Sequence, residues 1–537
     1  MRLSGANIAP GLATGRAYVY QDVLEQDLHM YDILPEQVEA ECERLHRAAN
    51  EVLEDLKESA RRVAQQIESY QSEIFTAHQM MLGEFLERHE IQQEVEKEQV
   101  NAEVAVHLVF QRWVREMHED ESTRFSQRAD DIADLGRRLI RALRAISVHP
   151  LEKIPAGSIL VASRLLPSDA IFFASRGVAA IVVERGTPSS HCALLTRQIN
   201  VSGISNVSNV TETIRTGDLV CVDGFRAAVV VNPDKETQRS FEERIAEYHV
   251  RGVEARARCH EPAIAPNGVP VPVMANIANR ADAQVAAQNG ADGVGLYRLE
   301  GLFMLHKTLP TEQELLREMS GTLSPLGKKL AMIRLLDVGG DKSLTYLEFP
   351  IEPAPCLGRR GMRVLLAHPA LLDVQLRALL RLSQRRRTQI VVPMVTIPED
   401  MQAVRNAVES QASQLGITEI PPLVAMIETP AAALSVPDIL QFADALSLGT
   451  NDLTQHTMAA GRQNSLVQRY YQDDHPAVVR LIRLPVKEAG GAPVGVCGEL
   501  AGQPNAVPML LDAGIRLLSV APPLVPTIKE AVRHPPE

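Results

Sequence analysis

The second half of the sequence alternates short apolar runs with longer segments of helical pattern, and this alternation constrains the fold most. Eight apolar runs occur, at positions 271–277, 293–297, 332–338, 389–395, 423–428, 445–449, 493–497 and 516–521. Consecutive parallel strands need a helical crossover between them, so eight strand–helix repeats predict a (β/α)8 TIM barrel over residues 259–537. An open doubly wound sheet is the alternative, which we disfavour because such sheets commonly hold about six strands.

The first half of the sequence changes in texture along its length. Residues 1–33 contain an alternating stretch with glycine turns, which predicts a strand. Residues 34–147 are rich in helix formers, contain no proline after Pro35, and predict a helical bundle. Residues 148–233 hold short β-rich runs and predict a compact α/β unit, to which the N-terminal strand returns because a lone strand has no partner. Residues 234–258 are charged and predict a connecting helix.

The composition narrows the class of protein. The chain carries 55 lysines and arginines against 67 aspartates and glutamates, a formal charge of −12, and it offers no basic stripe for nucleic acid. The six cysteines are scattered without a C-x-x-C pair, which predicts a reducing compartment and no structural zinc. No apolar run approaches the ~18 residues of a membrane span, and the N-terminus lacks an apolar signal region. We therefore predict a cytoplasmic protein with neither a nucleic-acid nor a membrane partner.

Polar residues collect where the predicted barrel strands end, and the active site of such a barrel lies at those ends. Strand ends carry Arg298, Arg334, Asp337, Glu428, Asn451, Asp452 and Cys497, and the loops add Lys342, Arg360 and Arg462. The guanidinium fork of arginine matches carboxylate and phosphate oxygens, so several arginines predict a multiply anionic ligand.

Two carboxylates and one thiol in this set have alternative interpretations. Glu428 and Asp452 supply hard oxygen ligands, which beside a phosphate favour Mg²⁺, but they also fit salt bridges with the arginines. Cys497 fits either a catalytic thiol or a buried core cysteine.

A second candidate site lies in the string RGTPSSHCALLTR of the α/β unit. Gly186 and Pro188 predict a tight loop, after which His191 falls in the first turn of an apolar helix. A phosphate carried on this imidazole would be favoured by the helix dipole, so His191 fits a nucleophile as well as a capping or packing histidine. The chain has neither a P-loop nor a dinucleotide glycine motif, and we expect no nucleotide bound in those ways.

Further strings stand in a fixed order along the chain. They are SGANIAPGLATG, RADDIADLGRRL, GTPSSHCALLTR, GVGLYRLE, LPTEQE, RLLDVGGDK, APCLGRRGMR, AMIETPAA, LGTNDLTQ, DDHPAV and GVCGELAG. Together they resemble enzyme I of the phosphoenolpyruvate (PEP)-dependent phosphotransferase system, from about residue 4 to the C-terminus. Related dikinases and synthases carry a large ATP-binding domain, whereas the residues before His191 hold the predicted bundle instead. An ATP-using dikinase is therefore disfavoured.

The resemblance implies a reaction and a division of labour. PEP binds in the barrel with Mg²⁺, His191 takes its phosphoryl group, and a histidine of the carrier protein HPr receives it. Residues 1–33 and 148–233 form a swivelling phosphohistidine domain, the inserted bundle 34–147 docks the carrier, and 234–258 is the linker helix. Dimerisation through the barrel is also implied.

Each barrel residue receives a role from the same resemblance. The residues implied to bind the phosphate and carboxylate of PEP are Arg298, Arg334, Arg360, Asn451 and Arg462. Glu428 and Asp452 are implied to hold Mg²⁺, and Cys497 to protonate enolpyruvate at carbon. Phosphoryl transfer asks mainly for in-line positioning and charge neutralisation, which these residue types supply.

The chain departs from the family pattern at several positions. They are Thr187 for a glycine, Leu166 for a threonine that orients the histidine, Ser202 for a proline, Ala354 for an asparagine and His456 for a tyrosine. These changes motivate a second hypothesis, a degenerate regulatory relative that binds PEP and carrier without efficient turnover. The sequence fits a role in sugar uptake as well as a role in a regulatory pathway, and it fits any isoform of the carrier protein.

Overall fold

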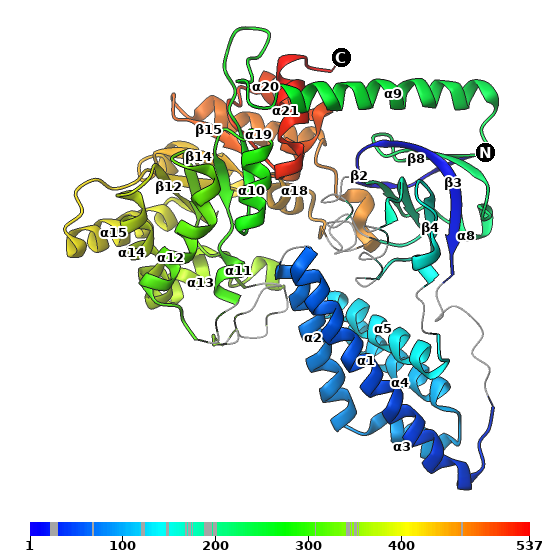
Figure 1. The fold of residues 1–537 in the computed structure, drawn as a ribbon. Helices are drawn as coiled ribbons and strands as arrows, with labels where there is room; N and C mark the ends of the chain where they lie inside the picture. Colours follow the sequence, from blue (N-terminus) through cyan, green and yellow to red (C-terminus); the bar gives the residue numbers. More distant parts are fainter. Residues whose placement is uncertain are drawn as a thin grey trace. The chain divides into compact units, whose positions relative to one another are not determined.

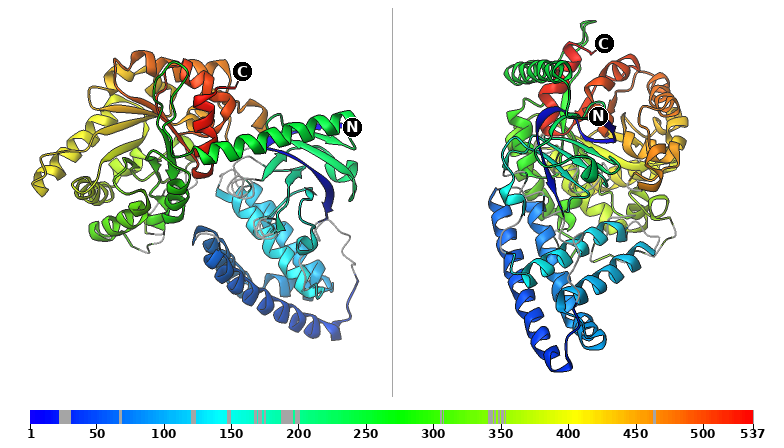
Figure 2. Two further views of the ribbon diagram at one scale, coloured as in Figure 1. Left: turned by 45° about the horizontal axis from the view of Figure 1, so that its top comes forward. Right: turned by 90° about the vertical axis from the view of Figure 1, so that its right-hand side faces the viewer.

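A computed structural model places most of the chain, which divides into two compact units, Met1–Tyr248 and His249–Glu537 (Figures 1 and 2). It describes residues 1–21, 31–66, 69–119, 124–146, 150–166, 176–186, 201–304, 308–339, 354–462 and 465–536, with Asp169, Phe173, Thr196, His306, Leu344, Tyr346, Leu347, Phe349 and Glu352. Within these ranges no helix is both long enough and apolar enough to cross a lipid bilayer.

Helices form the bundle of the first unit. They are α1 (Val38–Gln66), α2 (Ser69–Glu87), α3 (Glu90–Glu98), α4 (Ala102–Glu119) and α5 (Arg124–Leu143). Leu45 and Leu56 of α1 and Leu135 and Leu139 of α5 are buried together, which confirms the apolar spacing seen in the sequence. The sequence pattern does not predict α3 as a separate helix, because neither glycine nor proline flanks it. Its two ends are instead marked by His89 and Gln99, whose backbone is left-handed.

A mixed sheet of eight described strands forms the rest of this unit, in the order β1-β8-β7-β3-β4-β5-β6-β2. The strands are β1 (Arg2–Ser4), β2 (Ala6–Ala9), β3 (Leu12–Tyr20), β4 (Ile159–Ala162), β5 (Ala180–Val183), β6 (Ser202–Ser205), β7 (Leu219–Asp223) and β8 (Ala228–Val231), and a short helix α8 (Val210–Thr213) follows β6. Strand β3 runs parallel to β4 and antiparallel to β7. The N-terminal strand therefore returns to the α/β unit, as the sequence predicts.

A buried ionic network joins the bundle to the sheet. Arg137 of α5 donates to Asp169 at 2.9 Å, to Asp134 at 2.8 Å and to the Tyr20 hydroxyl at 3.1 Å. Asp169 also accepts from the backbone N–H of Leu166 at 2.8 Å. Because the three charged side chains are fully buried, each needs these partners to offset its lost hydration. The network thus ties α5 to the loop after β4.

Helix α9 (Lys235–Ala257) occupies the segment for which the sequence predicts a connecting helix (Figure 1). Contacts as far along as Tyr248 fasten this helix to the first unit: Arg244 donates to Asp223 at 2.6 Å, and Tyr248 packs edge-on against Phe225.

The second unit is a closed parallel barrel, with β9 pairing both β10 and β16. The strands are β9 (Val273–Ile277), β10 (Val294–Tyr297), β11 (Ala331–Arg334), β12 (Thr388–Val395), β13 (Leu423–Ile427), β14 (Ala445–Leu448), β15 (Val494–Val496) and β16 (Leu518–Val520). Each strand falls in one of the apolar runs of the sequence, give or take one residue. Closure confirms the TIM barrel and rules out the open sheet.

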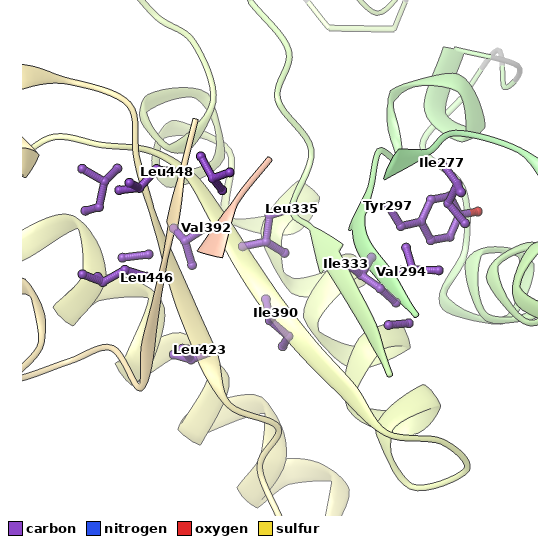
Figure 3. Close-up of a cluster of buried hydrophobic side chains, with 14 of the residues drawn as sticks. Ile277, Val294, Tyr297, Ile333, Leu335, Ile390, Val392, Leu423, Leu446 and Leu448 are labelled. Carbon is purple, nitrogen blue, oxygen red and sulfur yellow. The ribbon is translucent and has the colours of Figure 1, made fainter. Parts of the chain in front are cut away.

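Helices surround the barrel and bury one face of its strands. They are α10 (Arg280–Gln288), α11 (Glu300–Met304), α12 (Glu312–Leu323), α13 (Met362–Ala367), α14 (Pro369–Ser383), α15 (Pro398–Leu415), α16 (Pro430–Leu434), α17 (Val436–Ile439), α18 (Thr450–Met458), α19 (Pro476–Glu488), α20 (Val507–Asp512) and α21 (Val525–Arg533). Strand residues such as Ile333, Ile390 and Val392 join the helices in one large core (Figure 3). The alternate residues, among them Met274 and Met332, form a separate apolar cluster inside the barrel with Cys497.

Candidate active site

Arg360 joins two carboxylates that follow different strands of the barrel, β11 and β14. Asp337 comes after β11, and Asp452 lies in the first turn of α18, directly after β14. Arg360 donates to Asp337 at 3.1 and 3.0 Å and to Asp452 at 2.9 and 3.0 Å. Burial lowers the pKa of Arg360, but the two carboxylates raise it more, so the side chain keeps its charge. Asp452 is thus an ion-pair partner of an arginine in this structure, one of the two interpretations open from the sequence.

Arg334, the last residue of β11, lies beside the same carboxylates. It pairs with Asp337 at 3.2 Å and with Glu300 of α11, and its side chain is buried. Burial lowers its pKa, yet Glu300, Asp337 and Glu428 together raise it well above the ordinary arginine value. Arg334 and Arg360 therefore remain two fixed positive charges with Asp337 between them.

Glu428 follows β13 and is 1% exposed. Its Oε1 accepts a hydrogen bond from the backbone N–H of Met394 at 2.5 Å, and its own carbonyl contacts His456 Nδ1 at 2.9 Å. Burial, followed by repulsion from Asp452 and Asp337, raises the pKa of Glu428 to about 8. For Asp452 burial acts in the same direction, but Arg360 outweighs it and lowers the pKa. At neutral pH the negative charge of this pair therefore lies mainly on Asp452, and Glu428 gives up its proton readily only when a further positive charge comes beside it.

The surroundings of Glu428 fit a hard divalent cation. Among the described residues, no lysine, arginine or histidine forms a salt bridge with the Glu428 carboxylate. A cation bound beside Glu428 would supply this missing positive charge. A Cβ at Gly449 would lie 2.8 Å from Glu428 Oε2, so glycine at this position leaves room for that oxygen. The described residues contain no cluster of three histidine, cysteine or acidic ligands. A protein site for Mg²⁺ commonly supplies only one or two carboxylates, and water and a ligand phosphate fill the other coordination positions. Two carboxylates therefore fit Mg²⁺ better than a metal enclosed wholly by protein ligands.

Arg298, Asn451 and Arg462 line the same end of the barrel. Asn451 Oδ1 accepts from the N–H of Glu499 at 2.9 Å, and Arg462 pairs with the Glu499 carboxylate. Arg298 follows β10 and has an exposed side chain, although the surrounding protein strips part of its hydration. This desolvation, then repulsion from Arg334, lowers the pKa of Arg298. Because the side chain is exposed, an anion can approach Arg298 from solvent.

Cys497 directly follows β15, at the carboxyl end of that strand, and is 5% exposed. Its Sγ lies 3.4 Å from Ser447 Oγ and 3.6 Å from the Leu448 carbonyl. Burial raises the pKa of the thiol, and the contact with Ser447 opposes this only in part. The thiol is therefore protonated at neutral pH and has a proton to give.

Some predicted residues and departures can be placed and others cannot. His191, Thr187 and Lys342 lie outside the described residues. Leu166 is fully buried and Ser202 Oγ donates to the Gly11 carbonyl at 3.1 Å, so both substituted side chains serve the fold of the first unit.

Sequence reasoning missed two acidic partners of the predicted arginines, the bridging role of Asp337 and one backbone donor. The two acids are Glu300 and Glu499, and the donor is the N–H of Met394. Each acid stands one or two residues from a predicted site residue or inside the quoted strings, which was the available signal.

Family models match the chain in the order of its parts. A PEP-utilising enzyme N-terminal model matches residues 4–128, the mobile-domain model residues 154–227, and the PEP-binding domain model residues 253–536. The chain belongs to the PEP-utilising enzyme family.

Two relatives within this family are named phosphoenolpyruvate-protein phosphotransferase. The protein of Haemophilus influenzae is 32% identical over 99% of this chain and 94% of its own length. That of Geobacillus stearothermophilus is 32% identical over 97% of this chain and 90% of its own length. A solution structure of an Enzyme I protein covers 46% of this chain and 99% of its own, with 26% identity and a TM-score of 0.39.

Proposed function

We propose that the chain moves the phosphoryl group of PEP to His191 and then to a histidine of an HPr-type carrier protein, releasing pyruvate. This is the first step of a phosphotransferase system. One observation carries the proposal. Arg334 and Arg360 lie near Glu428 and Asp452, at one end of a PEP-binding barrel. Relatives named for the same reaction match over nearly their whole length.

The arginines bind the substrate in this proposal. Arg298, Arg334, Arg360 and Arg462, helped by Asn451, neutralise the phosphate and carboxylate of PEP. When Mg²⁺ is bound by Glu428 and Asp452, it neutralises charge that develops on the transferring phosphoryl group. Arg360 already holds Asp452, so a bound phosphate would compete for that guanidinium and release Asp452 toward the cation.

His191 and Cys497 divide the bond changes between them. A ring nitrogen of His191 attacks phosphorus in line, the bond to the enol oxygen breaks, and enolpyruvate leaves with the electron pair. Cys497 then gives its thiol proton to the methylene carbon, which yields pyruvate and a thiolate that solvent reprotonates. The protonated, buried thiol fits this role.

The remaining assignments follow the division of the chain. We assign carrier docking to the bundle 34–147, the phosphohistidine domain to 1–33 with 148–233, the linker to 234–258 and PEP binding to 259–537. A cytoplasmic location, a homodimer through the barrel and service to sugar transport complete the proposal. A degenerate regulatory relative is disfavoured because the arginines and both carboxylates are retained together.

Labelling with ³²P-PEP and Mg²⁺ tests the nucleophile. The wild-type chain should acquire an acid-labile, base-stable phosphoryl group, and His191→Ala should not. Labelling of the alanine variant at the wild-type rate would show that another residue is phosphorylated. An unlabelled wild-type chain would instead support the regulatory relative.

A further inference from the structure

Strand β12 contains a residue whose backbone conformation L-amino acids rarely adopt. Met394 has φ of +53° and is 2% exposed, one residue before the end of the strand. Such a conformation persists in a non-glycine residue only where the surroundings hold it, and it is concentrated at functional sites. The position of Met394 therefore calls for a physical reason.

A β-bulge accounts for the local geometry. Val392 pairs with Ala425 and Val395 with Ile427, so Pro393 and Met394 together face the single residue between those partners. Proline has no N–H, and the bulge turns the N–H of Met394 out of the ladder with β13. Bulges next to active sites commonly re-aim one group of the bulged strand.

The N–H that the bulge turns out donates to Glu428. The distance from Met394 N to Glu428 Oε1 is 2.5 Å, and both residues are buried. The other oxygen, Oε2, lies against Gly449, where any side chain would crowd it. One carboxylate oxygen is thus held by the backbone, while the second accepts no hydrogen bond from the described residues.

Neighbouring groups hold the left-handed peptide in place. A Cβ at Gly361 would lie 2.9 Å from Met394 Cβ, so the methionine packs closely on the glycine that follows Arg360. The Met394 carbonyl accepts from Thr396 Oγ1 at 3.2 Å. Met394 therefore contacts Glu428 through its backbone and the turn carrying Arg360 through its side chain.

We propose that Met394 is a positioning residue for the divalent cation: its left-handed backbone fixes Glu428 Oε1 and thereby presents Oε2 to the metal. This inference rests on the cation site of the proposed function. Groups that orient metal-ligating carboxylates commonly change metal affinity by about 10–100-fold when they are lost.

A pair of substitutions at Met394 separates backbone positioning from packing. Met394→Ala removes the side chain beyond Cβ, including the Cγ that packs on Gly361, but keeps the strain, so the backbone should relax and release Glu428. Met394→Gly removes the side chain and the strain together, so the N–H should stay in place. Packing alone predicts the reverse order, because glycine leaves the larger cavity and the more flexible unfolded chain.

Binding of Mn²⁺ alone to the full chain is measured from the electron paramagnetic resonance signal of free Mn²⁺. Thermal unfolding of each variant is measured in parallel. Met394→Ala should bind Mn²⁺ at least about tenfold more weakly than wild type, and Met394→Gly within about threefold. The matched control is Met274, a buried methionine of β9 with an ordinary backbone. There alanine should be more stable than glycine, and Mn²⁺ affinity should follow neither change.

Three outcomes would overturn the inference or its basis. If Met394→Ala binds Mn²⁺ as well as Met394→Gly, the backbone does not position the ligand. If the Met394 variants do not fold, Thr396→Val decides, because it removes only the hydroxyl that holds the Met394 carbonyl. Thr396→Val should weaken Mn²⁺ binding by a few-fold, and unchanged affinity would refute the inference. Failure of the wild-type chain to bind Mn²⁺ would instead refute the cation site of the proposed function.

Discussion

Replacing Cys497 should separate proton delivery from phosphoryl transfer. Transfer to His191 is complete once enolpyruvate has left, and only the conversion of enolpyruvate to pyruvate needs a proton at carbon. Cys497→Ala and Cys497→Ser should therefore keep PEP-dependent labelling close to the wild-type rate. Both should slow proton delivery by about 10²–10⁴-fold, the usual contribution of a general acid.

The two variants should differ in stability, which is why both are needed. Alanine leaves a small cavity and removes the sulfur that Ser447 Oγ contacts at 3.4 Å, at a cost of about 1–2 kcal/mol. Serine keeps a hydroxyl near Ser447 and the Leu448 carbonyl, so its loss should be smaller. A hydroxyl is nevertheless a far weaker acid than a thiol, and it should not rescue proton delivery.

The assay combines single-turnover labelling with the conversion of PEP to pyruvate in deuterated solvent, where NMR of the pyruvate methyl group reports the deuteron delivered to carbon. Burial raises the pKa of Cys497 above its ordinary value of 9.0, so thiol ionisation should not reduce wild-type proton delivery below pH 9. Equal losses of labelling and proton delivery that follow a lowered melting temperature would show that Cys497 is only a packing residue. Proton delivery that falls with a midpoint below pH 9 would contradict the buried, protonated donor.

Two further predictions concern the barrel. Glu428→Ala or Asp452→Ala should remove Mg²⁺-dependent labelling by PEP. The fragment 1–248 should still accept a phosphoryl group from phosphorylated carrier. A fragment that folds but accepts no phosphoryl group would refute this division of labour. Lys529 is fully buried and donates to the Gly290 carbonyl at 2.7 Å and to Asp292 at 2.9 Å. Lys529→Met should lower the free energy of unfolding by about 3–5 kcal/mol in urea titrations without changing labelling per folded molecule, and an unchanged midpoint would contradict it.

The barrel was predictable because its strands are buried on both faces and stand out as apolar runs between helical segments. The strand ends were less predictable. The third apolar run continues through Val338, but β11 ends at Arg334, and the residues beyond it form a buried loop that carries Asp337. Burial of a loop and burial of a strand leave the same apolar pattern in a sequence.

Pairing within the candidate site could not be predicted from residue types. Arginines and acids at strand ends indicate an anion and a cation site, but not that Asp337 bridges Arg334 and Arg360. The Arg334–Asp337 pair is local, but Arg360 reaches Asp337 because its segment folds back and pairs with Gly339, which residue types alone do not show. The bulge at Met394 had a local signal, because Pro393 stands inside a strand and proline in a sheet interior marks a bulge.

Transfer of the phosphoryl group to carrier tests the central claim most directly. Purified chain, ³²P-PEP and Mg²⁺ would be incubated with a panel of HPr-type carriers, and the label on each carrier histidine would be followed over time. The account predicts catalytic, PEP-dependent labelling of at least one carrier, and none with His191→Ala. Carriers that stay unlabelled while the chain binds PEP would contradict it.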